Sequence, residues 1–244
     1  MRIETFFSAA EAEDGQFANT TAVVIDVIRA TSTVVAALAA GARAVYPTLT
    51  SEEAIRLANS LGRDNALLCG ERRGLMIEGF DLGNSPAEFT PDLVSDSSLV
   101  MTTTNGMRAF LAVEAADRVI VAALVNLSAV AAAVSEFEQV AVVCAGKEGR
   151  FSLDDAVCAG LILTRLLDPH GPDTTDIQLD DASRSALALA AAYTVDEEFL
   201  RRTASGMALV EVGLDPDLKQ CAEIDRHRLV PEMHDRMIRL PGDG

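Results

Sequence analysis

Short runs of β-branched and aliphatic residues alternate with helical patterns over most of this chain, and that alternation restricts the fold more than any other feature. Residues 21–27 (TAVVIDV) have the composition of a buried strand, and residues 32–40 (STVVAALAA) that of a following helix. Strands that alternate with helices predict a mostly parallel sheet with helices on both faces. We therefore expect an α/β fold with a helical C-terminal portion.

The same pattern continues to residue 167. Expected strands lie at 21–27, 43–49, 66–69, 99–103, 119–123 and 140–145, and expected helices at 32–40, 51–61, 106–115, 127–137 and 152–167. Thr50 and Glu53 are spaced for a capping box at the start of the second helix. Residues 70–96 contain Gly and Pro without a clear period, and loops of that length are usually functional or disordered.

The composition changes near Asp168, where the segment DPHGPDTTD (168–176) is typical of a linker. We expect residues 1–167 to form the α/β domain that carries the functional motifs. Residues 168–244 are expected to be mainly helical, as a smaller domain packed on the first, with a final strand at 236–240.

The formal net charge of −17 makes nucleic acid and anionic membranes unfavourable partners. No apolar run approaches the roughly 20 residues that span a bilayer, and the N-terminus lacks a signal-peptide pattern. We expect a cytoplasmic protein without membrane or nucleic-acid partners, and a homo-oligomer is compatible with this composition. A small anionic ligand is indicated by the basic residues in or beside the loops described next, which are Arg29, Arg72, Arg73, Arg108, Lys147 and Arg150.

Polar residues follow four of the expected strands at the point where each strand ends. The four stretches are DVIRATST (26–33), GERR (70–73), TTTNG (102–106) and GKEGR (146–150). Each alone has an ordinary explanation, since Asp26 can cap a helix and Arg72 and Arg73 can form a solvated pair. The carboxyl ends of parallel strands share one edge, where ligands bind in open sheets. The occurrence of a polar stretch at each of four strand ends favours one site that all four stretches share.

The residue types in these stretches indicate a chemistry. Carboxylates beside hydroxyl and amide oxygens suit a hard cation such as Mg²⁺, and cations with free backbone N–H groups suit phosphate. Together they predict metal-assisted phosphoryl transfer. One alternative is a Cys144 nucleophile, because Cys144 and Arg150 have the Cys-x5-Arg spacing of cysteine phosphatases. Another is a non-catalytic module that binds a phosphorylated metabolite.

Four strings in this order resemble the 2-phosphosulfolactate phosphatase family: VVIDVIRATST (23–33), GERRGLMIEGFDLGNSPAEFT (70–90), TTTNG (102–106) and CAGKEGRFSLDDAVCAG (144–160). The resemblance extends from there through Asp217 to Pro231 and implies an α/β phosphoric monoester hydrolase. It implies hydrolysis of 2-phospho-3-sulfolactate, or a similar small phosphorylated acid, to sulfolactate and phosphate with Mg²⁺, on the route to coenzyme M. Arg73 and Lys147 depart from the expected pattern and add positive charge, which could alter which acid is bound.

The candidate site residues are hypotheses drawn from these stretches. Asp154 and Asp155 are weaker candidates, because they equally suit a helix N-terminus. The expected metal ligands are Asp26 and Glu148, followed by Glu71 and Asp81. The expected catalytic residues are Asp26, Glu148, Arg29 and Asn105. The expected substrate-binding residues are Arg29, Thr31, Ser32, Arg72, Asn84, Thr103, Thr104, Asn105, Gly106 and Arg150.

Overall fold

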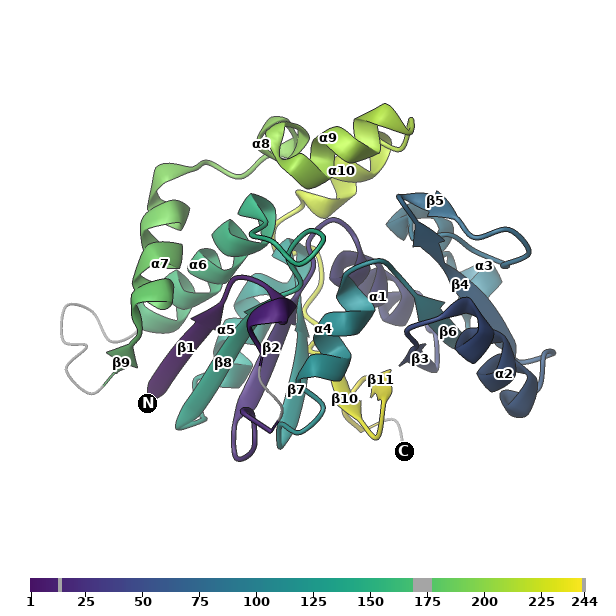
Figure 1. The fold of residues 1–244 in the computed structure, drawn as a ribbon, viewed down its shortest axis with the longest axis horizontal. Coiled ribbons are helices and arrows are strands. Elements are labelled where there is room, and N and C mark those ends of the chain that lie inside the picture. Colours follow the sequence, from purple (N-terminus) through teal and green to yellow (C-terminus); the bar gives the residue numbers. More distant parts are fainter. Residues whose placement is uncertain (13–14, 169–176, 243–244) are drawn as a thin grey trace.

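The structure, a computed structural model, describes residues 1–12, 15–168 and 177–242 of the chain. In these residues it has one 11-stranded, mostly parallel sheet with helices on both faces (Figure 1), so the expected α/β class is confirmed. The strands are β1 (Arg2–Phe6), β2 (Thr21–Ile25), β3 (Ala44–Pro47), β4 (Ala66–Arg72), β5 (Leu75–Met76), β6 (Ser98–Thr102), β7 (Arg118–Ala122), β8 (Gln139–Cys144), β9 (Gln178–Leu179), β10 (Glu232–His234) and β11 (Met237–Arg239). The α-helices are α1 (Ala30–Ala39), α2 (Ser51–Leu61), α3 (Pro91–Val94), α4 (Gly106–Ala112), α5 (Leu127–Val134), α6 (Leu153–Leu167), α7 (Asp181–Ala192), α8 (Glu197–Arg202), α9 (Ala204–Glu211) and α10 (Pro216–Cys221).

The sheet consists of two parallel sets of strands joined by a hairpin. One set is β4–β6–β3 and the other is β7–β2–β8–β1–β9, and the antiparallel hairpin β10–β11 lies between β7 and β3. Three successive antiparallel pairings, β3–β11, β11–β10 and β10–β7, reverse the formal direction of the first set relative to the second. The four strands with polar ends are therefore not all parallel neighbours.

Strand ends of both sets nevertheless meet. Neighbouring strands in a sheet are rotated by roughly 20 to 25°, and five pairings separate β6 from β2 in the strand order, so the two sets are far from a flat antiparallel arrangement. Residues from the carboxyl ends of β2, β4, β6 and β8 line one cavity, which is described below.

The set that contains β2 is buried on both faces. Ala22 and Val24 belong to a core formed with α1 and α4, whereas Val23 and Ile25 belong to a second core formed with α5 and α6. Apolar side chains at every position are typical of a strand in a sheet that is covered on both sides. This burial holds the end of β2, and with it Asp26, in a fixed place.

Every expected strand and helix between residues 21 and 167 is present, with ends shifted by a few residues at most. At α2 the N–H of Glu53 donates to Thr50 Oγ1, and the Glu53 carboxylate accepts from the N–H of Leu49, one residue earlier than in a standard capping box. The long loop expected at 70–96 is interrupted by regular structure. Strand β4 continues to Arg72, and both β5 and α3 lie within this stretch.

The strands β1, β9 and β10 are not anticipated by the sequence. The β10–β11 hairpin turns at Asp235 and Arg236, which have φ values of 50° and 59°. Turns of this kind usually contain Asn-Gly or Asp-Gly, so the usual sequence signal is missing here. The expected strand at 236–240 is present as β11.

The C-terminal portion contributes to the same sheet through β9, β10 and β11, and α7 packs against α6. Helices α8, α9 and α10 lie beyond the carboxyl ends of β1 and β2, at the top of Figure 1. The expected linker at 168–176 falls almost entirely outside the described residues, and the division at residue 167 stays a prediction. Among the described helices, none has the length and apolarity needed to cross a membrane.

The α6–α7 contact provides a test of the packing. A Cβ added to Gly160 would overlap the backbone carbonyl of Ala186 and lie 2.8 Å from Ala190 Cβ. We expect Gly160→Ala to lower the free energy of unfolding by about 1 to 3 kcal/mol through overpacking, although alanine favours a helix by about 1 kcal/mol. Denaturant titration measures the change.

Ser185→Ala is the matched control, because Ser185 lies on the exposed side of α7. It should leave stability within about 0.5 kcal/mol of the wild-type value. A Gly160→Ala variant as stable as the wild-type protein would contradict the close packing of α6 on α7.

Candidate active site

Residues from the ends of four strands line one cavity of about 360 Å³. They include Asp26 after β2, Glu71 near the end of β4, the 103–105 segment after β6, and Lys147 and Glu148 after β8. Helix α9 adds Ser205, Ala208, Leu209 and Glu211. The volume is in the range of sites that bind small molecules.

Asp26 is the buried carboxylate in this cavity with the most unused hydrogen-bonding capacity. Its side chain accepts one N–H, that of Ala30, at 3.3 Å, and no further hydrogen bond from a described residue reaches its carboxylate. Burial raises the pKa of Asp26 from 3.8 to about 7, and the neighbouring carboxylates of Asp154 and Glu71 raise it as well. This environment favours a partner that brings positive charge.

Asp154 and Asp155 begin α6 and are both 2% exposed. Asp155 accepts the N–H of Val27 at 2.9 Å and that of Gly146 at 3.1 Å, so it ties the loop after β2 to the loop after β8. Burial raises the pKa of Asp155 well above its ordinary value, and the charges of Asp154 and Asp26 add to this. The role of Asp155 in the structure is to position these two loops.

Glu71 holds the neighbouring loops in place with both of its oxygens. Oε1 accepts the N–H of Thr104 at 2.7 Å, and Oε2 accepts the N–H of Gly74 at 2.8 Å and the Thr104 hydroxyl at 3.2 Å. The carboxylate thus connects the turn after β4 to the segment after β6. With three donors already bound, Glu71 has less capacity for a metal ion than Asp26.

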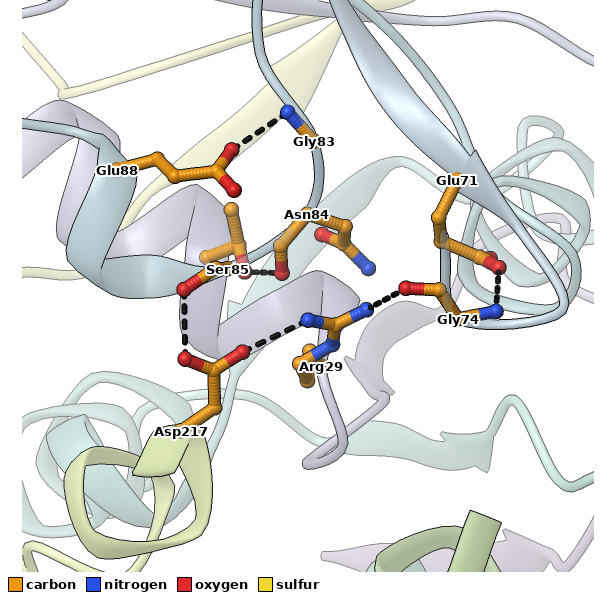
Figure 2. Close-up of polar contacts among 9 residues, drawn as sticks. Arg29, Glu71, Gly74, Gly83, Asn84, Ser85, Glu88 and Asp217 are labelled. Atoms are coloured by element: carbon orange, nitrogen blue, oxygen red, sulfur yellow. Dashed lines mark hydrogen bonds and ion pairs between the residues drawn. The ribbon is translucent and has the colours of Figure 1, made fainter. Parts of the chain in front are cut away.

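Arg29 is held directly by two segments of the chain, and a third segment holds its partner Asp217, as Figure 2 shows. Its Nη1 donates to Asp217 Oδ2 at 2.7 Å, and its Nη2 donates to the carbonyl of Gly74 at 2.7 Å. The other oxygen of Asp217 accepts the Ser85 hydroxyl at 2.6 Å. Arg29 is 4% exposed and still lines the cavity. A guanidinium has five N–H groups, so donors remain for an anion.

The segment after β6 approaches Asp26 closely. A Cβ at Gly106 would lie 2.7 Å from Asp26 Oδ2 and even closer to Ala30 Cβ, so only glycine fits there. Thr103 and Asn105 line the cavity, and Asn105 Oδ1 accepts the N–H of Glu148 at 3.0 Å. The structure thus brings the expected 103–106 stretch and Glu148 together with Asp26.

Arg73 and Lys147 line the cavity where Arg72 and Arg150 were expected to bind the substrate. Arg73 begins the two-residue turn between β4 and β5, with a φ of 53°. Glu148 has a φ of 52° in the turn closed by hydrogen bonds between Lys147 and Arg150. Each is followed by a glycine. A non-glycine residue in this backbone region is uncommon, and both of these lie in tight turns that border the cavity.

Several expected site residues make structural contacts and do not line the cavity. The hydroxyl of Thr31 bonds to the backbone of Asp26, and that of Ser32 donates to the carbonyl of Val27. Arg72 donates to Thr102 Oγ1 and to backbone carbonyls, and Arg150 is exposed at the far end of its turn. Asp81 pairs with Arg63 at 3.0 Å and accepts the N–H of Leu68.

The four cysteines are free and buried, as expected for Cys69 and Cys144. Burial raises the pKa of the Cys144 thiol well above its ordinary value, and the nearby charge of Asp155 raises it further. A neutral thiol is a poor nucleophile. Neither Cys144 nor Arg150 lines the cavity, so this geometry argues against the cysteine-phosphatase alternative.

The cavity has the donor chemistry of a magnesium site but not a complete protein cage. Among the described residues, no three His, Cys, Asp or Glu side chains form a group that could hold a metal ion by themselves. Mg²⁺ in proteins is commonly bound through one or two carboxylates, with waters and substrate phosphate completing its shell. Asp26 and Glu148 have the carboxylate oxygens for such a site.

Comparisons with known proteins all indicate the same protein family. A family model described as 2-phosphosulpholactate phosphatase matches residues 6–236. Three similar proteins, each named a probable 2-phosphosulfolactate phosphatase, come from Clostridium beijerinckii (37% identical, covering 98% of this chain and 99% of the relative), Caldanaerobacter subterraneus (37% identical, 100% of both chains) and Deinococcus radiodurans (41% identical, 91% of this chain and 88% of the relative). This protein therefore belongs to the 2-phosphosulpholactate phosphatase family.

Proposed function

We propose that this protein hydrolyses the phosphate ester of 2-phospho-3-sulfolactate, or of a similar small phosphorylated acid, with Mg²⁺ as cofactor. The main support for this proposal is that one cavity contains the buried carboxylate of Asp26 together with the cations Arg29, Arg73 and Lys147. Membership of a phosphatase family supports a phosphoric monoester hydrolase, and the names of the relatives support the substrate.

The charges around the cavity favour a substrate with more than one acidic group. Arg29 is partly neutralised by Asp217, whereas Arg73 and Lys147 have no ion pair within the part of the chain that the structure describes. A phosphate next to Arg29 would leave Arg73 and Lys147 available for a carboxylate and a sulfonate. Asp26, Glu71, Glu148 and Glu211 also line the cavity. With a bound cation to offset these carboxylates, three cationic side chains for three anionic groups support a phosphorylated sulfo-acid over a simple alkyl phosphate.

The reaction moves a phosphoryl group from the ester oxygen to water. The bond between phosphorus and the ester oxygen breaks, and a bond from phosphorus to the water oxygen forms. The departing alkoxide takes up a proton from solvent, to which the proton of the attacking water is later returned. In our assignment Arg29 donates to the phosphoryl oxygens, whose charge it stabilises. Glu148 takes the proton of the attacking water. Asn105 positions Glu148, because its Oδ1 accepts the backbone N–H of Glu148.

Bound Mg²⁺ would supply charge stabilisation at the phosphoryl oxygens. Asp26 and Glu148 would hold it, because the oxygens of Glu71 are occupied by three donors and Asp81 is paired with Arg63. The raised pKa of Asp26 supports this assignment, since a cation would offset the cost of its buried charge.

The direct test is phosphate release from a panel of small phosphorylated acids, including 2-phosphosulfolactate, with Mg²⁺ and with EDTA. We expect release that requires Mg²⁺ and is fastest for the sulfonated acid. Asp26→Asn should lower kcat by roughly a hundredfold or more, because changes next to metal sites already cost up to about a hundredfold. Ligand-induced thermal stabilisation without any turnover would favour the non-catalytic module instead.

The pH dependence of stability follows from the raised pKa of Asp26. In the metal-free protein, folded Asp26 binds its proton more tightly than unfolded Asp26, so the free energy of unfolding should fall as pH rises from about 4 to about 7. Asp26→Asn, which stays neutral, should lose part of that decline. Denaturant titrations at a series of pH values measure both curves, and parallel curves would refute the environment assigned to Asp26.

Arg73 and Lys147 should determine which acid is preferred. We expect Arg73→Ala and Lys147→Ala each to raise KM for the sulfonated substrate roughly tenfold. Both variants should leave kcat/KM for p-nitrophenyl phosphate, which has no second acidic group, nearly unchanged. Arg150→Ala is the matched control, because this exposed arginine does not line the cavity. Equal losses on both substrates would contradict a role in recognition.

A further inference from the structure

Helix α9 is the wall of the cavity that the C-terminal portion of the chain supplies. Four of its residues line the cavity, and Val212, which follows its last residue, does so as well; the four are Ser205, Ala208, Leu209 and Glu211. The helix lies beyond the carboxyl ends of β1 and β2 (Figure 1), and none of its residues takes part in the proposed reaction. Its position nevertheless determines how closely the cavity surrounds a bound molecule.

A chain of hydroxyl groups connects α9 to the start of α6. The Ser152 hydroxyl donates to Asp154 Oδ1 at 2.6 Å, and Ser152 Oγ lies 3.3 Å from Ser205 Oγ. A hydroxyl has one proton and two lone pairs. Because Ser152 gives its proton to Asp154, it accepts the proton of Ser205. The buried carboxylate of Asp154 thus sets the direction of both hydrogen bonds.

The place of Ser152 in the chain predicts a different use of its hydroxyl. Ser152 is the N-cap residue of α6, where a serine usually accepts a backbone N–H of the first turn. Its hydroxyl makes no such bond to the described residues of α6 and is directed at Asp154 and Ser205 instead. The local needs of α6 therefore do not explain the direction of this hydroxyl.

Asp154 holds the chain of hydroxyls more firmly than a neutral acceptor would. Within the described part of the chain this buried carboxylate has no ion pair. Burial raises the pKa of Asp154 above its ordinary value, and the hydrogen bond from Ser152 lowers it. A hydrogen bond to an ionised carboxylate is roughly twice as strong as one between neutral groups, so Ser152 is held tightly.

The other end of α9 contacts the opposite side of the cavity. A Cβ added to Gly74 would lie 3.4 Å from Val212 Cγ2 and 3.8 Å from Leu209 Cδ2, so both side chains pack on the β4–β5 turn. Helix α9 thus reaches from the loop after β8 to the turn after β4. An apolar contact of this kind tolerates small shifts, whereas a hydrogen bond is lost beyond about 3.5 Å. The serine link therefore restricts the position of the helix more narrowly.

We propose that Asp154 is a positioning residue, which through Ser152 and Ser205 holds α9 in the place where this helix encloses the substrate. The inference rests on the proposed function for its kinetic test, whereas the position of α9 can be measured without turnover. It assigns a task to a buried carboxylate that the proposed reaction does not use.

Amide hydrogen exchange, followed by mass spectrometry, measures how firmly α9 is held. We expect Ser152→Ala and Asp154→Ala each to speed the exchange of residues 205–211 roughly three- to tenfold, and to leave the exchange of α2 unchanged. Asp154→Asn keeps an acceptor oxygen for Ser152 and should change the exchange of α9 less than Asp154→Ala does. Unchanged exchange of α9 in Ser152→Ala, or equal effects of the two Asp154 variants, would overturn the proposal.

Kinetics with 2-phosphosulfolactate separate positioning from direct contact with the substrate. We expect Ser152→Ala and Ser205→Ala each to raise KM roughly three- to tenfold, with kcat within about twofold of the wild-type value, because α9 supplies no group to the proposed reaction. If Ser205 acts through Ser152, the double variant should be no worse than either single variant. Losses that add would mean that Ser205 itself contacts the substrate, and they would contradict the proposal.

Ser183→Ala is the matched control. The Ser183 hydroxyl is buried and lies 2.8 Å from Thr5 Oγ1, so this change removes a similar pair of hydroxyls, between α7 and β1. Ser183 does not line the cavity. The variant should leave KM and the exchange of α9 unchanged even where it lowers Tm. A rise in KM as large as that of Ser152→Ala would mean that general destabilisation suffices, which would refute the positioning role.

The same preparations distinguish this inference from the proposed function. Faster exchange of α9 in Ser152→Ala, in a protein whose wild type releases no phosphate, would leave the positioning role in place and refute the hydrolase. Wild-type hydrolysis together with unchanged exchange of α9 in Ser152→Ala would do the reverse.

Discussion

The buried ion pair between Arg29 and Asp217 joins the parts of this protein that form the cavity. Through it, helix α10 near the C-terminus contacts the loop after β2, and through Ser85 and Gly74 it also reaches the 83–86 segment and the β4–β5 turn. A buried ion pair contributes little net stability, because both charges lose their hydration. Removing one partner is nevertheless costly, at about 3 to 5 kcal/mol. Its main value here is therefore geometric: it fixes the guanidinium that lines the cavity.

The second constraint is the hairpin β10–β11 in the middle of the sheet. Without it, β3 and β7 would have no bridge, and the two parallel sets would be separate sheets. The hairpin reverses the direction between them, and residues from the carboxyl ends of both sets still line one cavity. One set supplies Glu71 and Thr103, and the other supplies Asp26 and Glu148. The C-terminal residues thus complete both the sheet and the site.

Much of this arrangement can be predicted from the sequence, because it depends on local patterns. Apolar runs followed by polar residues locate the strand ends, and Asp26 and Glu71 were found that way. Which of two adjacent cations faces the cavity depends on turn geometry, and here Arg73 and Lys147 do so instead of Arg72 and Arg150. The partnership of Asp217 with Arg29 joins residues 188 positions apart, which no local pattern can reveal. The hairpin turn at 235–236 lacks the glycine that would announce it.

In the proposed function, Asp26 and its neighbours bind a divalent cation next to a phosphate. The most direct measurement is a crystal structure of the protein with Mn²⁺ and inorganic phosphate, with the metal located by its anomalous scattering. We predict one Mn²⁺ within about 2.5 Å of an Asp26 oxygen, with phosphate between the metal and Arg29. An anomalous peak remote from Asp26, or phosphate bound outside the cavity of Asp26 and Arg29, would contradict it.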